Sequence, residues 1–434
     1  MSREKEFAKE LIDFIYDSPT AFHAVESAKD LLHKQGFTEL KEEDSWSLEK
    51  GGKYYVTKND SALTAFVVGA GKIEEHGFKI IGAHTDSPCF RIKPAAEMTV
   101  ENHYIKLNTE TYSGPILSTW MDRPLSVAGR VTLRGGDLFN PITKLVNIKK
   151  PILIIPNLAI HMNRNMNQGV ELNKQKDMLP LLGLINENLE KGNYLIATIA
   201  KEINVEFKQI LDFDLFLYEY EKGTIMGLND EFISSPRLDD LAMVHAGVTA
   251  IAKSKAANST NVMVCFDNED IGSSSKQGAD SPLLSGILER IILAMGGDRQ
   301  NYFRAIAKSF MISADMTHAV HPNVGEKHDP QNRPLINKGP VIKISANMKY
   351  TTDSNSAAVY ADICKQAEVP VQYFVNRSDE AGGSTIGPIT AAHINIRSVD
   401  IGNPSLAMHS VRELAGVMDH SYVTKSFIEF FSLS

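Results

Sequence analysis

Residues 78–88, FKIIGAHTDSP, are the stretch from which the fold of this chain can be worked out. The apolar residues 78–82 predict a buried strand, and His84 and Asp86 follow it directly. Open α/β sheets bind their ligands beyond the carboxyl ends of parallel strands. A histidine at such a place can bind a metal while a nearby carboxylate fixes its tautomer. A surface turn with incidental polar residues is the alternative interpretation of this segment.

The rest of the chain shows the same alternation of strands and helices on either side of a different middle part. Alternation of this kind indicates a mostly parallel sheet with helices on both faces. We expect helices at 6–16, 24–35, 241–252, 283–294, 357–365 and 420–431, and strands at 54–57, 63–68, 78–82, 261–266, 309–314, 369–375 and 393–401.

The middle part, from about residue 92 to 236, has a β-rich texture. Short β-like segments at 105–107, 127–133, 152–155 and 213–217 are separated by Gly, Pro and Asn. Because the alternation resumes after Pro236, we expect residues 92–236 to be a β-rich insertion in one α/β domain made of residues 1–91 and 237–434.

Composition excludes several classes of protein. The 434 residues are 43% hydrophobic and 23% charged, as in ordinary globular proteins. The formal net charge of −8 argues against nucleic acid as a partner, and no apolar run approaches the roughly 20 residues that cross a bilayer. The charged N-terminus lacks the apolar core of a signal peptide. With three dispersed cysteines and no C-x-x-C, we expect a cytoplasmic protein without a disulfide framework.

Four further polar segments follow predicted strands or begin a predicted helix. They are RLDD at 237–240, DNEDIGS at 267–273, SADMTH at 313–318 and MHS at 408–410. Two of them have an ordinary alternative when taken alone: Asp239 is suited to cap a helix, and 267–273 is suited to a solvated loop. Three carboxylates within 267–270 repel one another unless a cation or protons lie between them.

Taken together, the segments supply two histidines and three carboxylates for one site, namely His84, Asp239, Asp270, Asp315 and His409. This donor set suits a pair of divalent ions with one carboxylate bridging them. Two ions about 3.5–4 Å apart polarise a carbonyl and lower the pKa of a water. Glu269 is then left over as a general base.

At these residues the chain resembles the aspartyl-aminopeptidase-like family of dinuclear metallo-aminopeptidases, over almost its whole length. The matching segments stand in family order at 18–25 (SPTAFHAV), 82–94, 114–131, 155–164 (IPNLAIHMNR), 235–240, 266–279, 313–323, 338–344 (KGPVIKI), 382–388 (GGSTIGP) and 408–413. The resemblance implies a zinc-exopeptidase-like mixed sheet flanked by helices. It also implies that 92–236 is a dimerisation domain, in a dodecamer built from dimers.

The resemblance further implies a role for each residue of the predicted site. His84 and Asp315 hold one metal ion, Asp270 and His409 hold the other, and Asp239 bridges them. Glu269 is the general base, and Asp86 orients His84. Position 270 is Asp where the family usually has Glu, and the shorter side chain alters the reach to its ion.

Four more residues are implied to contact the substrate: His161, His318, Lys343 and Tyr350. His161, in the inserted domain, is implied to reach the active site of a dimer mate. Without the resemblance, His161 is an ordinary loop histidine and Lys343 a strand-edge lysine. Residues 382–388 lack the spacing of a phosphate-binding loop and are predicted to form a tight turn near the site.

The predicted function is removal of the N-terminal residue, acidic or neutral, from small peptides. The cofactor is two divalent ions per subunit, with Zn²⁺ favoured and Co²⁺ or Mn²⁺ as alternatives. Neither nucleic acid nor a membrane is expected as a partner. Two other functions stay open at this point: a non-catalytic, shell-forming family member, and another metal-dependent amide hydrolase.

Overall fold

The computed structural model describes residues 2–185 and 193–433, and the chain divides into two compact units. The first unit comprises Met1–Asp86, Gly223–Met408 and Glu413–Ser434, and the second comprises Ser87–Lys222 and His409–Arg412. The second unit thus occupies 87–222 where the sequence placed the insertion at 92–236. It also includes the short segment 409–412, which the sequence had assigned to the α/β domain.

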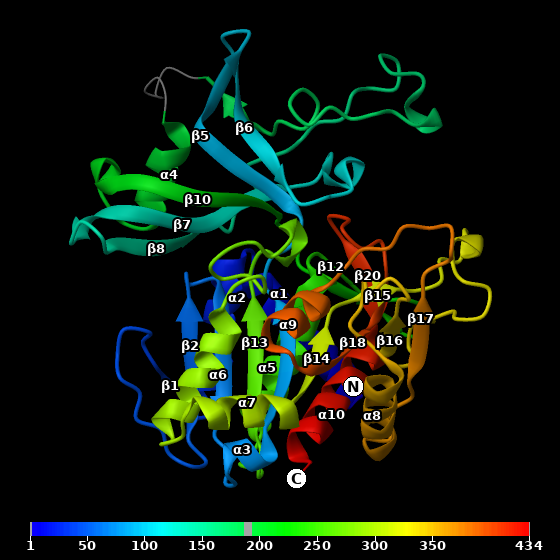
Figure 1. Cartoon of the computed structure of the whole chain (residues 1–434). Helices are drawn as coiled ribbons and strands as arrows, with labels where there is room; N and C mark the ends of the chain where they lie inside the picture. The colour runs from blue at the N-terminus through cyan, green and yellow to red at the C-terminus, as the bar shows by residue number, and fades with distance from the viewer. Residues whose placement is uncertain (1, 186–192, 434) are drawn as a thin grey trace. The chain divides into compact units, whose positions relative to one another are not determined.

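The first unit is built on a mixed nine-stranded sheet in the order β1-β2-β3-β13-β4-β14-β18-β16-β17 (Figure 1). Its centre, β13-β4-β14-β18, is parallel, and antiparallel pairs lie on either side. The strands are β1 Thr38–Glu39, β2 Lys53–Lys58, β3 Ala62–Val67, β4 Phe78–His84, β13 Thr260–Phe266, β14 Phe310–Ala314, β16 Val341–Ile344, β17 Gln372–Val375 and β18 Arg397–Gly402. The predicted mixed α/β sheet is confirmed.

Helices cover both faces of this sheet. Successive residues of a strand point to opposite faces, and Ile80 and Ile81 of β4 accordingly enter two different apolar clusters. One cluster includes residues of α1 Arg3–Asp17, α2 Ala21–His33, α5 Leu238–Lys253, α8 Ser354–Gln366 and α10 Val417–Ser432. The other includes residues of α3 Ile73–His76, α6 Leu283–Ala294, α7 Arg299–Lys308 and α9 Ile386–Ile394. Strands β3, β13 and β14 are buried throughout, as expected for strands covered on both faces.

A small five-stranded sheet completes the first unit, in the order β11-β12-β20-β19-β15. Its strands are β11 Thr224–Met226, β12 Phe232–Ser235, β15 Thr317–His318, β19 Pro404–Leu406 and β20 Glu413–Gly416. Two 3-10 turns also lie in this unit, η4 Glu269–Ile271 and η5 Gly325–Lys327.

The second unit is an antiparallel six-stranded sheet in the order β8-β7-β10-β5-β6-β9. Its strands are β5 Cys89–Val100, β6 Tyr104–Tyr112, β7 Leu125–Gly136, β8 Pro141–Asn147, β9 Leu181–Leu184 and β10 Ile210–Glu219. The helical segments are α4 Tyr194–Glu202 and the 3-10 turns η1 Leu117–Trp120, η2 Met166–Gln168 and η3 Phe207–Gln209. An apolar core of its own, around Trp120 and Leu217, holds the unit together.

Several predicted elements were wrong. Residues 153–155 of the strand predicted at 152–155 form isolated bridges instead, and residues 393 and 394 end helix α9 before β18 begins at 397. The tight turn predicted at 382–388 includes the start of α9, because the Thr385 side chain caps the helix by accepting the Gly387 N–H. Helix α7 was missed although Asp298 and Asn301 form a capping box at its start.

None of the helices that the structure describes combines the length and the apolar character that crossing a membrane requires.

Candidate active site

The site is built around His84, the last residue of β4. Its side chain is 1% exposed, and its backbone N–H donates to Asp240 Oδ2 at 2.9 Å. Ring atom Nδ1 lies 3.3 Å from Asp86 Oδ1 and 3.1 Å from the Asp86 carbonyl oxygen. Asp86 therefore lies against one ring nitrogen and leaves Nε2 to the acids on the other side of the ring.

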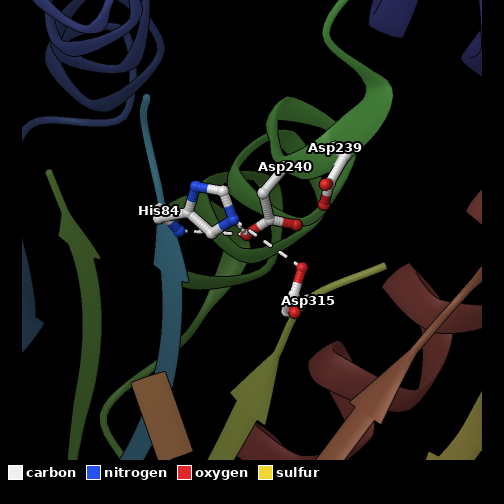
Figure 2. A group of neighbouring side chains, drawn as sticks. All are labelled: His84, Asp239, Asp240 and Asp315. Carbon is white, nitrogen blue, oxygen red and sulfur yellow. Dashed lines mark hydrogen bonds and ion pairs between the residues drawn. The ribbon is translucent and has the colours of Figure 1, made fainter. Parts of the chain in front are cut away.

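Three acids form a group with His84. His84, Asp239, Asp240 and Asp315 each offer one ligand atom within 4.8 Å of the others (Figure 2). The His84 Nε2 atom is 3.7 Å from Asp315 Oδ1 and 4.0 Å from Asp240 Oδ2. These residues come from the end of β4, the start of α5 and the residue after β14, so segments distant in the sequence converge on His84.

The start of α5 is shaped to present its two acids. Arg237 occupies the N-cap position and makes no side-chain cap bond, so the interpretation of Asp239 as an ordinary helix cap was wrong. Asp239 and Asp240 have non-helical backbone angles and are joined by a cis peptide bond. The Asp239 N–H donates to Glu413 Oε2 at 2.9 Å, which ties this turn to β20.

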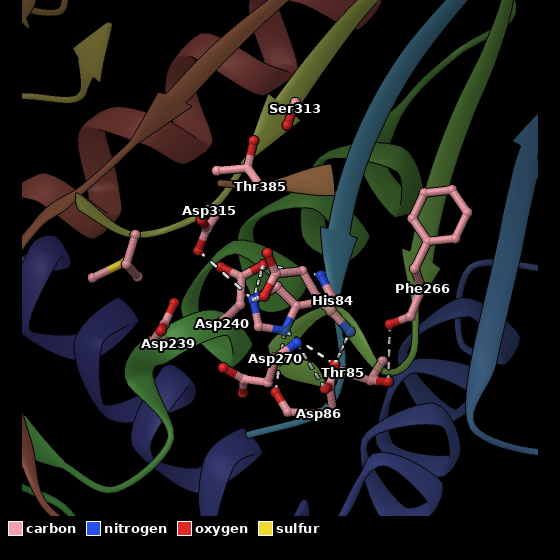
Figure 3. A network of polar contacts seen from close by, with 12 residues as sticks. His84, Thr85, Asp86, Asp239, Asp240, Phe266, Asp270, Ser313, Asp315 and Thr385 are labelled. Atoms are coloured by element: carbon pink, nitrogen blue, oxygen red, sulfur yellow. Dashed lines mark hydrogen bonds and ion pairs between the residues drawn. The ribbon is translucent and has the colours of Figure 1, made fainter. Parts of the chain in front are cut away.

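A second group forms from His84, Asp86 and Asp270, whose ligand atoms also lie within 4.8 Å of one another (Figure 3). The Asp86 carboxylate accepts the N–H of Glu269 at 3.0 Å and the N–H of Asp270 at 3.1 Å. The turn after β13 begins at Asn268, whose φ of 64° lies in the left-handed region that asparagine tolerates. Asp86 thus contacts both the His84 ring and the backbone of the acidic turn.

Glu269 lies at the edge of the acid cluster. Its Oε2 atom is 3.8 Å from His84 Nε2. Burial raises the pKa of Glu269 to about 8; His84 opposes the rise, and the negative charges of Asp315 and Asp86 add to it. A carboxylic acid with a raised pKa can exchange a proton near neutral pH.

The charges of this group fit a cation. Burial raises the pKa of Asp240 well above its ordinary value, and the Oδ1 atom of Asp240 is buried without a hydrogen bond among the described residues. Burial lowers the pKa of His84, but Asp240 and Asp315 raise it by more, to well above its ordinary value. Buried like charges are costly unless a counter-ion compensates them. Imidazole and carboxylate are ligands that zinc accepts.

One cation of the chain itself reaches the cluster, Lys343 of β16. Its side chain is 2% exposed, and Nζ lies 3.1 Å from Asp315 Oδ2 and donates to the Met316 carbonyl at 2.6 Å. Burial raises the pKa of Asp315, but Lys343 and His84 lower it by more, to far below its ordinary value. Because β16 pairs with strands on both sides, the interpretation of Lys343 as a strand-edge lysine was wrong.

Aromatic side chains lie beside this lysine. The Tyr350 ring is buried, with its centroid 5.5 Å from Lys343 Nζ and 6.3 Å from the Phe374 ring. His318, on β15, is exposed and stands edge-on to Phe374 at 6.0 Å. Of the four predicted substrate contacts, Lys343 thus lies beside Asp315, and His318 and Tyr350 lie beside Phe374.

The remaining two predicted site residues belong to the second unit. His409 is partly buried with φ 65°, and its Nδ1 atom is 3.3 Å from the Gly114 carbonyl oxygen. His161 is exposed in a turn.

Sequence reasoning missed three contributors to the site: Asp240, Glu413 and the ion pair of Lys343 with Asp315. The signal for Asp240 was present, because it stands next to Asp239 in the RLDD segment. Glu413 and Lys343 lie in the matching segments 408–413 and 338–344, but their bonds to Asp239 and Asp315 depend on which strands become neighbours.

Comparisons with known proteins identify the family of the chain. The family model described as aminopeptidase I zinc metalloprotease (M18) matches residues 14–431. A curated relative from Clostridium novyi (strain NT), named "Probable M18 family aminopeptidase 2", is 65% identical over 433 residues and covers 100% of both chains.

Solved structures give the same result. The cryo-EM structure of the Ape4 and Nbr1 complex has a chain 38% identical to this one, with a TM-score of 0.94, covering 99% of this chain and 86% of the other. The S. cerevisiae mApe1 dodecamer is 28% identical with a TM-score of 0.86, covering 99% of this chain and 97% of the other.

Proposed function

The chain belongs to the family of aminopeptidase I zinc metalloproteases (M18), and from this premise we propose how its residues hydrolyse the N-terminal peptide bond of a peptide. The chain is a metallo-aminopeptidase. The observation that carries the assignment of residues is the convergence of His84, Asp239 and Asp315 within 4.8 Å of one another, beside Glu269.

The proposed cofactor is a pair of divalent ions, with zinc favoured and cobalt or manganese as alternatives. His84 and Asp315 would hold one ion, Asp270 and His409 the other, and Asp239 would bridge. Asp240 belongs to the first group of ligand atoms around His84, and Asp86 belongs to the second. These additional carboxylates support the proposal that the site binds cations. When bound, such ions polarise the scissile carbonyl and lower the pKa of a water.

Glu269 is proposed as the general base and acid. It accepts a proton from the attacking water and later delivers this proton to the leaving amine. Its pKa of about 8, raised by burial, suits both transfers near neutral pH. Asp86 holds His84 in one tautomer through Nδ1 and fixes the backbone of Glu269 by accepting its N–H.

His318, Lys343 and Tyr350 are proposed to contact the substrate, with His161 supplied by a dimer mate. Lys343 is already paired with Asp315, so an acidic first residue of the substrate would share this lysine with Asp315. Rates on Asp-, Glu-, Leu- and Met-arylamides separate an acidic from a neutral preference.

We further propose a homo-oligomer built from dimers through the second unit, with a dodecamer as its final size. The support is the likeness to the mApe1 chain, which forms a dodecamer. A molar mass from light scattering near twelve times 48.0 kDa is the expected result, and a monomer contradicts the proposal. The free thiols of Cys265 and Cys364 support the proposed cytoplasmic location.

Glu269→Gln tests the proposed mechanism. The variant should retain its metal content and lose ~100-fold or more in turnover, the usual scale for general acid–base catalysis. Turnover close to that of the wild type removes Glu269 from this role. Acetylating the substrate's amino group should abolish cleavage, whereas cleavage of the blocked peptide would indicate another kind of amide hydrolase.

A further inference from the structure

We propose that Asp400 is a positioning residue for this reaction: its buried carboxylate holds the segment that carries Tyr350, and the start of α9, against the end of β14. The inference rests on the proposed function, because it takes Tyr350 as a substrate contact and Asp315 as a metal ligand.

Asp400 lies on β18, beside the strand end that leads to the site. It is opposite Ser313 of β14 in the parallel pairing, and the next carbonyl along β18, that of Ile401, accepts the Asp315 N–H at 3.0 Å. The Asp400 side chain is 0% exposed, so protein groups alone surround it. Asp400 therefore adjoins the backbone that places Asp315, and its carboxylate bonds to Ser313, Thr351 and Thr385, which lie outside the acid cluster.

The carboxylate joins three segments that are distant in the sequence. Oδ1 accepts the hydroxyl protons of Ser313 at 2.5 Å and Thr385 at 2.7 Å, and Oδ2 accepts the backbone N–H of Thr351 at 2.6 Å. Figure 3 shows Ser313 and Thr385 beyond Asp315 at the edge of the site. A hydroxyl can rotate to another acceptor, but the N–H of Thr351 has a fixed direction, so this bond fixes the segment.

Two more contacts fasten the same segment to β18. The backbone N–H of Asp400 donates to Thr352 Oγ1 at 2.9 Å, and Thr351 Oγ1 lies 2.6 Å from Ser398 Oγ. Tyr350, directly before these threonines, lies 5.5 Å from Lys343 Nζ. Holding residues 351 and 352 therefore holds the Tyr350 ring beside Lys343.

The start of α9 approaches the same carboxylate closely. A Cβ atom at Gly387 would lie 2.4 Å from Asp400 Oδ2, so any side chain at position 387 would collide with it. Thr385, which caps α9, also donates to Asp400. The buried carboxylate of Asp400 thus explains why position 387 is glycine and why position 385 carries a hydroxyl.

A second buried carboxylate provides a matched control. Asp419 of α10 is also 0% exposed, and it accepts the N–H of Asn337 at 2.5 Å and that of Gly339 at 2.8 Å. Both acids anchor loops through backbone N–H groups, but only Asp400 anchors the Tyr350 segment. A general loss of stability should affect variants of Asp400 and Asp419 alike, whereas misplacement of Tyr350 should occur only in a variant of Asp400.

The test compares Asp400→Asn with Asp419→Asn in the full-length, zinc-loaded protein. Measurements are zinc content, Tm, kcat and KM on an aminoacyl arylamide, and hydrogen exchange of peptides spanning 345–353 in the zinc-free protein. We expect both variants to lower Tm. Only Asp400→Asn should raise KM, by about 10-fold or more, which corresponds to one lost hydrogen bond to a charged group. It should retain zinc and exchange faster at residue 351.

A double substitution with Tyr350→Ala separates positioning from a general effect. If Asp400 acts through Tyr350, adding Asp400→Asn to Tyr350→Ala should change KM by ~2-fold or less. If the KM changes caused by the two substitutions multiply in the double variant, the two residues act independently and the proposal is overturned. An unchanged KM in Asp400→Asn, or an equal rise in Asp419→Asn, also overturns it.

If Asp400→Asn does not fold, Thr385→Ala and Thr385→Ser take its place. KM should rise in the alanine variant and stay at the wild-type value in the serine variant, which keeps the hydroxyl; equal KM values overturn the proposal. A wild-type protein that binds zinc but cleaves no arylamide contradicts the proposed function instead. Hydrogen exchange at residue 351 then still decides whether Asp400 orders this segment.

Discussion

Replacing Asp86 by alanine should uncouple the acidic turn after β13 from His84. The substitution removes the acceptor for the N–H groups of Glu269 and Asp270, at 3.0 and 3.1 Å, and the group 3.3 Å from His84 Nδ1. Hydrogen bonds to a charged group contribute about 1.5–3 kcal/mol each, so the two backbone bonds together contribute roughly 3–6 kcal/mol to holding this turn.

Part of that free energy should appear as weaker metal binding and slower turnover. Loss of a group that orients a metal-binding histidine lowers metal affinity by about 10–100-fold. We expect zinc affinity of Asp86→Ala to fall in this range. With zinc at saturation, kcat/KM should still fall by ~100-fold, because Glu269 is no longer held in place. Competition with a chelator of known affinity measures the first quantity, and arylamide hydrolysis the second.

The control is Asp280→Ala. Asp280 is an exposed acid between β13 and α6, as the acidic turn is, and its carboxylate bonds to Ser274 and His393. The substitution should change neither quantity. If Asp86→Ala binds zinc as the wild type does and its kcat/KM lies within ~3-fold of the wild type, the role given to Asp86 is refuted.

Three further predictions use other parts of the first unit. Chelating the metal should abolish activity and lower Tm, since a ligand at ~1,000 times its Kd stabilises the folded state by about 4 kcal/mol; zinc should restore both, and an unchanged Tm would contradict the buried cation site. If the chain binds the proposed pair of ions, Asp270→Ala should bind one ion fewer per chain in elemental analysis, and an unchanged count would exclude Asp270 as a ligand. The buried pair His245 and His420, whose Nδ1 and Nε2 atoms lie 2.9 Å apart, should make the fold acid-sensitive. Burial lowers the pKa of His245 to about 3 and that of His420 well below its ordinary value, so the unfolded chain takes up protons first as the pH falls. Each histidine should therefore remove about 1.4 kcal/mol of stability per pH unit below about 6.5. Urea unfolding at pH 7 and 5 measures this loss, and His245→Gln should reduce it.

The sequence predicted the parts of this molecule that depend on local pattern. Apolar runs such as 261–266 became the buried strand β13, and the polar residues after these runs met at one edge of the sheet. That convergence follows from parallel strand order, because the carboxyl ends of parallel strands lie together. His84, Asp239 and Asp315 could therefore be grouped from sequence.

What the sequence did not predict depends on tertiary neighbours. Lys343 stands in an apolar strand, and only the pairing of β16 between β17 and β18 shows that it is buried against Asp315. The segment 393–401 mixes helical and extended residues, because α9 ends at Ile394, the C-cap Asn395 is left-handed with φ 52°, and β18 begins at Arg397. Asp400 was not singled out, since a buried acid within the strand sequence RSVDIG carries no recognisable motif.

The buried acids in and around the site share one function. Each anchors the backbone of a site segment by accepting its N–H: Asp240 from His84, Glu413 from Asp239, Asp86 from Glu269 and Asp270, and Asp400 from Thr351. A carboxylate has two oxygens that only accept, so it can hold a fixed N–H without presenting a donor to it. Asparagine at the same position can place N–H against N–H. The N–H groups of His84, Asp239 and Glu269 each donate to one of these carboxylates, and a buried N–H requires such a partner. Acids at these positions therefore satisfy the backbone and at the same time supply the negative charge that favours a cation.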